Sequence, residues 1–449
     1  MATHAFPTTA PTLEAEALEA EALEFVRDLI RIESVNTGDL ATIGDGEARA
    51  AAYVRDALEE VGYEVAYVES TPGRGNVVAR LAGSDPSRGA LVVHAHLDVV
   101  PVEGQDWTHP PFGAEIEDGV LYGRGAVDMK HFAGVILAVA RAFKRERVVP
   151  ERDLVFAFFA DEEAGGTWGA RWLVEHRPEL FDGATEALSE VGGFSVPLAP
   201  GRRAYLAATA EKGVAWARLR ARGRPGHGSR PTDDNAVVRL ARAVATIGEH
   251  RFPVTRTAAV EELLRVFGAA RGIEFDDERI DDQLAELGFV GGLVAASLRD
   301  TASPTVLGAG AKTNVIPASA TAALDLRVLP GHEESFRRDL RALVGDGIEI
   351  EVGPWIPPIA ADPAAPLLGV IRRAIGREDP DGVVVPYLLP ASTDNKHLAR
   401  LGIAGYGFVP LRVPDGFDVF GQFHTADEHV PVESLAFCAR VTAEVLRGA

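Results

Sequence analysis

The chain has 449 residues, of which 47% are hydrophobic, and a single cysteine. This length allows two or three domains with large cores, and one cysteine excludes a disulfide framework and fits a reducing compartment. The formal net charge of −21, from 45 basic and 66 acidic side chains, argues against nucleic acid and anionic membranes as partners, because both require a basic face.

The first 209 residues predict an α/β domain. Amphipathic helices are expected at about 15–31 and 47–61, followed by strands near residues 64, 76, 90, 154 and 204 with helices between them. The amino terminus has neither the basic nor the apolar segment of a signal peptide, and no later apolar run approaches the roughly 20 residues that span a bilayer. We therefore expect a cytoplasmic protein. The alternation of strands and helices in the first domain predicts a sheet with helices on both faces.

From residue 210 the pattern changes. Segment 213–223 alternates small or apolar residues with Trp216 and arginines, as in a sheet that packs on one face only. Helices at 236–248 and 333–344, strands near residues 322 and 348, and a charged helical insert at about 260–288 complete a small α+β unit. We predict a mixed-sheet catalytic domain, made of residues 1–209 and 354–449, around an inserted lid or dimerisation domain at 210–353.

Three motifs place acids or histidines where an apolar segment ends, which is where open α/β sheets build their sites. In HAHLDVVP, strand alternation puts His96 and Asp98 on one face, although on its own this spacing is more typical of a buried histidine satisfied by an aspartate. Asp128 follows a glycine-rich turn and precedes an apolar helix, where an aspartate taken alone is more typical of an N-cap. After strand 154–160, Glu162 and Glu163 adjoin Asp161, and three adjacent carboxylates favour a compensating cation. Together the motifs predict a metal centre.

Six further blocks follow in a fixed order: SEVGGF at 189–194, PGHGSRP at 225–231, TNVIP at 313–317, LDLRVLPG at 324–331, STDNKH at 392–397 and HTADE at 424–428. With the three motifs, this order resembles the di-zinc aminoacylase and carboxypeptidase metallopeptidase family, which includes acetylornithine deacetylase and succinyl-diaminopimelate desuccinylase. The resemblance covers the chain from about residue 20 onward and is strongest to the carboxypeptidase S and N-acyl-amino-acid hydrolase branch.

The resemblance implies two zinc ions per chain. His96 and Glu190 would hold one ion, and Glu163 and His424 the other. Asp128 would bridge the two. Imidazoles and carboxylates suit Zn²⁺ and also accept Co²⁺ or Mn²⁺.

The same resemblance implies hydrolysis of an amide bond in N-acyl amino acids or small peptides with a free carboxylate. Glu162 would be the general base, Asp98 would orient His96, and His227 would help to hold the oxyanion. The substrate-binding residues implied are Asn314, Arg327, Ser392 and Thr393. Ala391 departs from the glycine-rich turn that many relatives have before this position.

The resemblance also implies that His227 acts in trans, within a homodimer that forms through the edge strands of two lids. A monomer whose lid brings His227 to its own site is the alternative. Two other functions stay open. One is a binuclear hydrolase of phosphoesters or cyclic amides, against which the lack of a glycine-rich phosphate loop counts. The other is a non-catalytic peptide-binding protein, against which the retention of Glu162 and of every ligand candidate counts.

Overall fold

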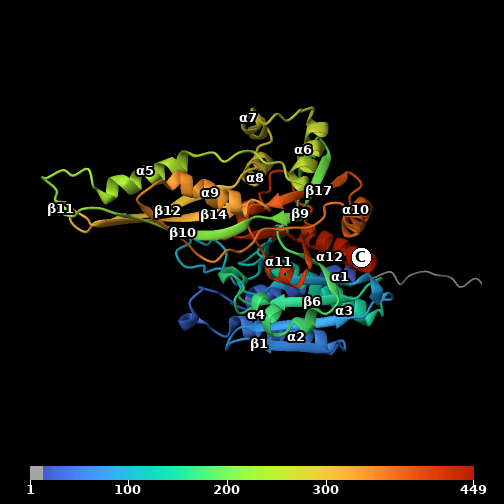
Figure 1. Ribbon diagram of the computed structural model, residues 1–449. Coiled ribbons are helices and arrows are strands. Elements are labelled where there is room, and N and C mark those ends of the chain that lie inside the picture. The colour runs from blue at the N-terminus through green and yellow to red at the C-terminus, as the bar shows by residue number, and fades with distance from the viewer. Residues whose placement is uncertain (1–13) are drawn as a thin grey trace, which may run out of the picture. The chain divides into compact units, whose positions relative to one another are not determined.

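The computed structural model describes residues 14–449 (Figure 1). The described chain forms two compact units. The first comprises the chain up to Ala208 together with residues 362–385 and 393–449, and the second comprises residues 209–361 and 386–392. The use of the second unit as a lid stays a prediction.

A mixed sheet forms the centre of the first unit. Its strands follow the order β1 (Val65–Glu69), β2 (Gly75–Leu81), β6 (Leu154–Phe159), β3 (Ala90–His96), β7 (Ala184–Ser189), β18 (Ala404–Gly407) and β9 (Arg202–Glu211), and β8 (Ser195–Ala199) and β17 (Gly382–Leu389) also pair with β9. The neighbours β6, β3, β7 and β18 run parallel, whereas β1, β2, β8 and β9 pair antiparallel. This arrangement confirms the predicted mixed-sheet α/β class.

Helices cover both faces of this sheet because its central strands are apolar on both sides. On β6, Val155 and Phe159 pack with Leu173, which lies in α4 (Ala170–His176). Phe156, on the opposite face, meets Tyr63 edge-on. The remaining helices of this unit are α1 (Ala15–Arg31), α2 (Gly46–Glu60), α3 (Lys130–Arg145), α10 (Pro366–Glu378), α11 (Asn395–Leu398) and α12 (Val432–Gly448). A small sheet of β4 (Glu115–Glu117), β5 (Val120–Tyr122) and β19 (His429–Pro431) ties the C-terminal segment to the loop before α3.

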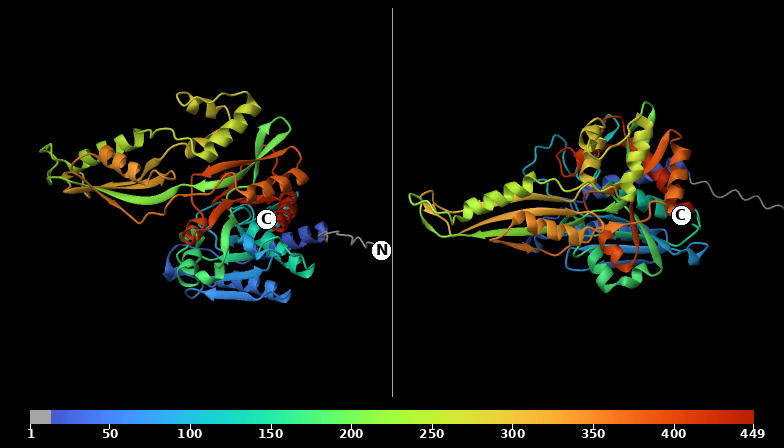
Figure 2. Two further views of the ribbon diagram at one scale, coloured as in Figure 1. Left: turned by 45° about the vertical axis from the view of Figure 1, so that its right-hand side comes forward. Right: turned by 45° about the horizontal axis from the view of Figure 1, so that its top comes forward.

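The second unit contains an antiparallel sheet of β12 (Thr301–Ala309), β14 (Ser319–Val328), β10 (Gly213–Arg222) and β15 (Ile348–Val352). Along β10 buried and exposed residues alternate, as the sequence predicts. Helices α5 (Ala236–Glu249) and α9 (Glu333–Val344) lie along one face of this sheet (Figure 2). Their residues Leu240 and Phe336 pack into its apolar core. Two short pairs, β11 (Gly226–His227) with β13 (Val315–Ile316) and β16 (Ile359–Ala360) with β9, complete the strands of this unit.

The helical insert is longer than the predicted 260–288 and is broken into three pieces. These are α6 (Ala258–Arg271), α7 (Ile280–Ala285) and α8 (Phe289–Ser297). Helix α6 ends where Gly272 adopts a left-handed conformation with φ of 70°, a common helix terminator. Between residues 14 and 449, no helix has both the length and the apolar character needed to cross a bilayer.

Candidate metal centre

Three parallel strands of the first unit bring acids and a histidine to one edge of the sheet. Strand β3 lies between β6 and β7 and ends at His96. The chain leaves β6 for Glu163 and leaves β7 for Glu190. Because the carboxyl ends of parallel strands share an edge, these three side chains converge although they lie far apart in sequence.

Two loops complete the cluster and give it two halves. In the first, His96 Nε2 lies 3.2 Å from Asp128 Oδ1 and 3.6 Å from Glu190 Oε2. In the second, His424 Nε2 lies 3.3 Å from Asp128 Oδ2 and 3.2 Å from Glu163 Oε2. Within each half the potential ligand atoms all lie within 4.8 Å of one another. Asp128 therefore belongs to both halves, with one carboxylate oxygen in each.

This spacing fits metal ions. Two atoms bound tetrahedrally to one zinc ion at about 2.1 Å lie about 3.4 Å apart, and the separations between histidine and carboxylate atoms here are 3.2–3.6 Å. Glu163 Oε1 is buried and has no hydrogen-bond partner. A buried acceptor of this kind is costly unless a cation or a donor satisfies it.

The charges of the site also favour cations. Burial, followed by the charge of Asp128, raises the pKa of Glu163 to about 8. Burial also raises the pKa of Glu190 to about 7, although His96 opposes the shift. Hydrogen bonds to Asp128 and Glu163 raise the pKa of His424 to about 10. Without metal, bound protons therefore neutralise part of the negative charge that two divalent ions would otherwise neutralise.

Asp98 contacts both His96 and the turn that carries Glu162 and Glu163. Its backbone oxygen lies 2.9 Å from His96 Nδ1, and its carboxylate Oδ1 lies 3.4 Å from the same nitrogen. The carboxylate also accepts hydrogen bonds from the backbone N–H groups of Glu162 (3.1 Å) and Glu163 (3.0 Å). One buried aspartate thus leaves His96 Nε2 facing the cluster and fixes the turn that carries both glutamates.

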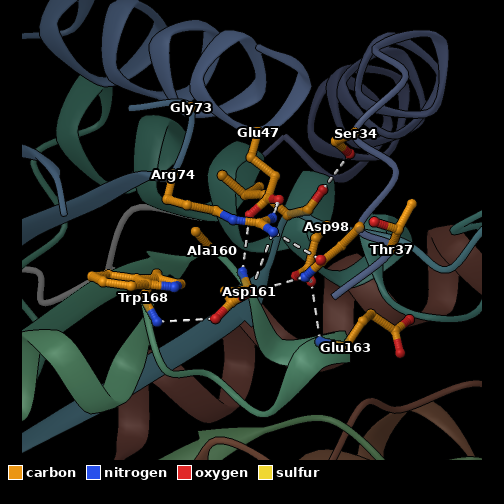
Figure 3. A network of polar contacts seen from close by, with 12 residues as sticks. Ser34, Thr37, Glu47, Gly73, Arg74, Asp98, Ala160, Asp161, Glu163 and Trp168 are labelled. Carbon is orange, nitrogen blue, oxygen red and sulfur yellow. Dashed lines mark hydrogen bonds and ion pairs between the residues drawn. The ribbon is translucent and has the colours of Figure 1, made fainter. Parts of the chain in front are cut away.

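A buried polar network supports this turn (Figure 3). Asp161, which precedes the two glutamates, has a left-handed conformation with φ of 66°. Its carboxylate accepts hydrogen bonds from the backbone of Trp168 and from Asn36, whose amide also reaches Asp98 at 2.8 Å. Arg74 pairs with Glu47 and lies 3.5 Å from Asp161. These partners hold a backbone conformation that is unfavourable for a residue with a side chain.

Glu428 holds the backbone of the loop that carries Asp128. Its buried carboxylate accepts hydrogen bonds from the backbone N–H groups of Gly125, Val127 and Asp128 and from the Arg124 guanidinium. Glu428 lies in the HTADE block, but its sequence pattern predicts no role for it. The only local signal was its place four residues after His424.

Lys396 is a second residue at this site whose contact the sequence does not predict. Its ammonium Nζ lies 3.4 Å from Glu162 Oε1. Glu162, the predicted general base, belongs to neither half of the cluster, whereas its neighbour Glu163 contacts His424. The two adjacent glutamates therefore have different partners.

The predicted oxyanion and substrate residues belong mainly to the second unit. His227 is exposed on β11, and its Nδ1 lies 2.8 Å from the Ser229 hydroxyl. The Arg327 guanidinium donates to the Asp325 carboxylate two residues away on β14. Asn314 accepts a backbone hydrogen bond from Gly228.

Ser392 closes the short segment 386–392 of the second unit. Thr393, with which the first unit resumes, is buried, and its hydroxyl accepts a hydrogen bond from the backbone of Asn395. The roles of all predicted substrate residues stay predictions.

Three other histidines of the first unit are buried outside the two halves. His94 Nε2 lies 3.0 Å from Asn395 Oδ1, and His397 Nε2 lies 3.1 Å from the backbone oxygen of Gly165. Both ring nitrogens of His131 are buried without a hydrogen-bond partner. None of these three histidines belongs to either half of the cluster.

Comparisons with known proteins identify the family of the chain. The family model described as Peptidase family M20/M25/M40 matches residues 92–448. Aminoacylase-1 of Pongo abelii is 29% identical over 370 residues, covering 81% of each chain. The N-fatty-acyl-amino acid synthase/hydrolase PM20D1 of Bos taurus is 26% identical over 431 residues, covering 90% of this chain and 81% of its own.

Solved structures share the fold. An M20 family metallo-carboxypeptidase from Sulfolobus solfataricus superposes with a TM-score of 0.69 at 18% identity, over 95% of this chain and 98% of its own. A Bacillus subtilis protein whose structure is described as a dinuclear metal binding peptidase from the M20 family gives a TM-score of 0.60 at 16% identity, over 96% of this chain and 98% of its own. Since the family model spans most of the chain, this protein is a hydrolase that belongs to peptidase family M20/M25/M40.

Proposed function

We propose that this protein is a binuclear zinc hydrolase that cleaves the amide bond of N-acyl amino acids or of small peptides with a free carboxylate. The observation that carries the proposal is the position of Asp128, whose two carboxylate oxygens face two separate histidine and glutamate pairs. The names of the relatives support the substrate class. Aminoacylase-1 and the fatty-acyl-amino acid hydrolase point to N-acyl amino acids, and a carboxypeptidase S-like protein of Dictyostelium discoideum, 28% identical over 373 residues, points to peptides.

The five clustered residues would hold two ions, which we propose to be zinc, with Co²⁺ or Mn²⁺ as substitutes. His96 and Glu190 would bind one, Glu163 and His424 the other, and Asp128 both. When bound, such ions lower the pKa of a water molecule and polarise the carbonyl of the substrate.

The residues of the chain itself would handle the proton and the substrate. Glu162, outside both halves, would take the proton of the attacking water and return it to the leaving nitrogen. His227 would stabilise the oxyanion, and Asn314 and Arg327 would bind the carbonyl and carboxylate of the substrate. Ser392 and Thr393 would form one wall of the pocket.

The test is a substrate screen with wild type and Glu162→Gln. N-acyl amino acids, dipeptides, a phosphoester and a cyclic amide are compared at one enzyme concentration. We expect hydrolysis of one of the first two classes and a loss of about 10²- to 10⁴-fold in kcat in Glu162→Gln with unchanged metal content. The exposed Glu179→Gln is the control for the same chemical change. Full activity of Glu162→Gln, or turnover of only the phosphoester or the cyclic amide, would overturn the proposal.

We further propose that the chain is a cytoplasmic homodimer that pairs through residues 210–353 and uses His227 in trans. The support is a set of exposed apolar side chains on the sheet of the second unit. Val306 and Leu307 lie on its edge strand β12, and Trp216 on β10 is 65% exposed. Mixing inactive His227→Ala with inactive Glu162→Gln should restore part of the activity. No recovery after proven subunit exchange would mean that His227 acts in cis or has no catalytic role.

A further inference from the structure

The adjacent residues Glu162 and Glu163 lie in one acidic turn but contact different partners. Glu163 Oε2 lies 3.2 Å from His424 within the metal cluster. Glu162 Oε1 lies 3.4 Å from the ammonium of Lys396, on a different element. The sequence Glu162-Glu163 alone does not determine which of the two carboxylates binds metal. The contacts that each side chain makes in the folded protein must therefore determine it.

The segment that carries Lys396 is fastened to the acidic turn. Helix α11 begins at Asn395, whose side chain meets His94 of β3 at 3.0 Å. Two residues later in the same helix, His397 Nε2 lies 3.1 Å from the backbone oxygen of Gly165, which ends the turn that carries Glu162 and Glu163. The two segments are also tightly packed, because a Cβ added to Gly166 would come within 2.6 Å of Asp394 Oδ1 and 2.9 Å of His397 Nε2. The position of Lys396 relative to Glu162 is thus fixed from both sides.

The burial of Lys396 indicates that its charged side chain has a specific role at this position. The residue is only 4% exposed, and an ammonium is expensive to remove from water unless an anion compensates it. The Glu162 carboxylate lies within ion-pair distance. An ion pair with this ammonium would hold Glu162 Oε1 beside Lys396, and Glu162 belongs to neither metal half.

We infer that Lys396 is a positioning residue that acts through Glu162, keeping this glutamate out of the metal coordination and oriented as the general base; this inference rests on the proposed function. The competing roles are contact with the carboxylate of the substrate and a purely structural contribution. Each predicts a different pattern of kinetics, because a residue that acts through Glu162 has nothing to act on once Glu162 is gone.

The test is a double-mutant cycle of wild type, Lys396→Met, Glu162→Gln and the double variant, with kcat, KM and bound metal measured for each. The substrate is the N-acyl amino acid or dipeptide that wild type cleaves fastest. We expect Lys396→Met to lower kcat by about 10- to 100-fold, since small misplacements of a catalytic group have effects of this size, with KM changed less than about threefold. The double variant should match Glu162→Gln within about threefold. Metal content should equal that of wild type in all four proteins.

Two further variants complete the experiment. Lys396→Arg, which keeps the cation, should recover most of the loss. Arg400→Met removes an exposed cation one turn further on, which pairs with Glu175, and should have wild-type kinetics. If Lys396→Met does not fold, Lys396→Gln, which removes the positive charge but stays polar, replaces it in the same cycle, and the same loss of kcat is expected.

Three outcomes would overturn the inference. These are wild-type kcat in Lys396→Met, a further loss in the double variant beyond Glu162→Gln, and a rise in KM as large as the fall in kcat. Retained activity in Glu162→Gln alone would instead contradict the proposed function, whatever the Lys396 variants show.

Discussion

The carboxylate of Glu428 accepts a hydrogen bond of 2.9 Å from the backbone N–H of Asp128, 300 residues away in the sequence. The same carboxylate takes two more backbone donors of that loop and an ion pair from Arg124. Since Asp128 has one oxygen in each half of the cluster, the position of the whole loop decides whether both halves can form. His424 precedes Glu428 by four residues, so this contact also ties the loop of His424 to that of Asp128.

Glu428→Gln should therefore weaken metal binding although it changes no ligand. The amide keeps the size of the side chain but loses the negative charge and one acceptor, and loss of such supporting contacts typically lowers metal affinity by about 10- to 100-fold. Competition with a chromophoric chelator measures the affinity. The exposed Glu433→Gln is the matched control. An affinity of Glu428→Gln equal to that of the control would show that the anchor is dispensable.

The Arg74 network should contribute strongly to stability. Arg74→Met leaves the buried carboxylates of Glu47 and Asp161 without their cation, and breaking one partner out of a buried ion pair usually costs about 3–5 kcal/mol. Urea unfolding monitored by circular dichroism gives the value. The double variant Glu47→Gln with Arg74→Met should be more stable than Arg74→Met alone, because one orphaned charge is removed. Equal stability of the two would mean that Glu47 does not depend on Arg74.

The three buried histidines outside the metal cluster should each make the folded state less stable as the pH falls below about 6.5. Burial lowers the pKa of His94 to about 4 and those of His131 and His397 to about 3. Between these values and the ordinary pKa of about 6.5 the unfolded chain binds protons that the folded chain does not, so acid favours unfolding, and the loss is absent above about pH 6.5. His397→Gln should reduce the slope by up to about 1.4 kcal/mol per pH unit between pH 6 and 4.5. An unchanged slope would show that His397 takes up its proton in the folded state as well.

The sequence predicted the parts of the site that local patterns encode. Apolar strands followed by acids located His96, Glu163 and the edge of the sheet, and the resemblance added His424. The sequence could not reveal the contact between Lys396 and Glu162, because the two residues are 234 positions apart and only folding brings them together. The breaks in the helical insert near Gly272 and Gly288 were likewise missed, since a glycine in a helical pattern can either be tolerated or end the helix.

Removal of metal should destabilise the first unit. A ligand that binds only the folded state at about 100 times its Kd stabilises that state by about 2.7 kcal/mol, and residues 14–449 provide two candidate sites. Dialysis against a chelator should therefore lower Tm and abolish hydrolysis, and added Zn²⁺ should restore both. Calorimetry with and without chelator is the measurement. An unchanged Tm together with full activity in the chelator would be incompatible with a resident metal centre.

The metal content of purified wild type and of Asp128→Asn, measured by elemental analysis, tests the central claim most directly. Asp128 is the one residue shared by the two halves, so its carboxylate should be needed for both ions. We predict about two divalent ions per wild-type chain, and fewer than one in a folded Asp128→Asn variant after dialysis against metal-free buffer. A wild-type content of zero or one in active enzyme, or two tightly bound ions in Asp128→Asn, would contradict a binuclear centre bridged by this aspartate.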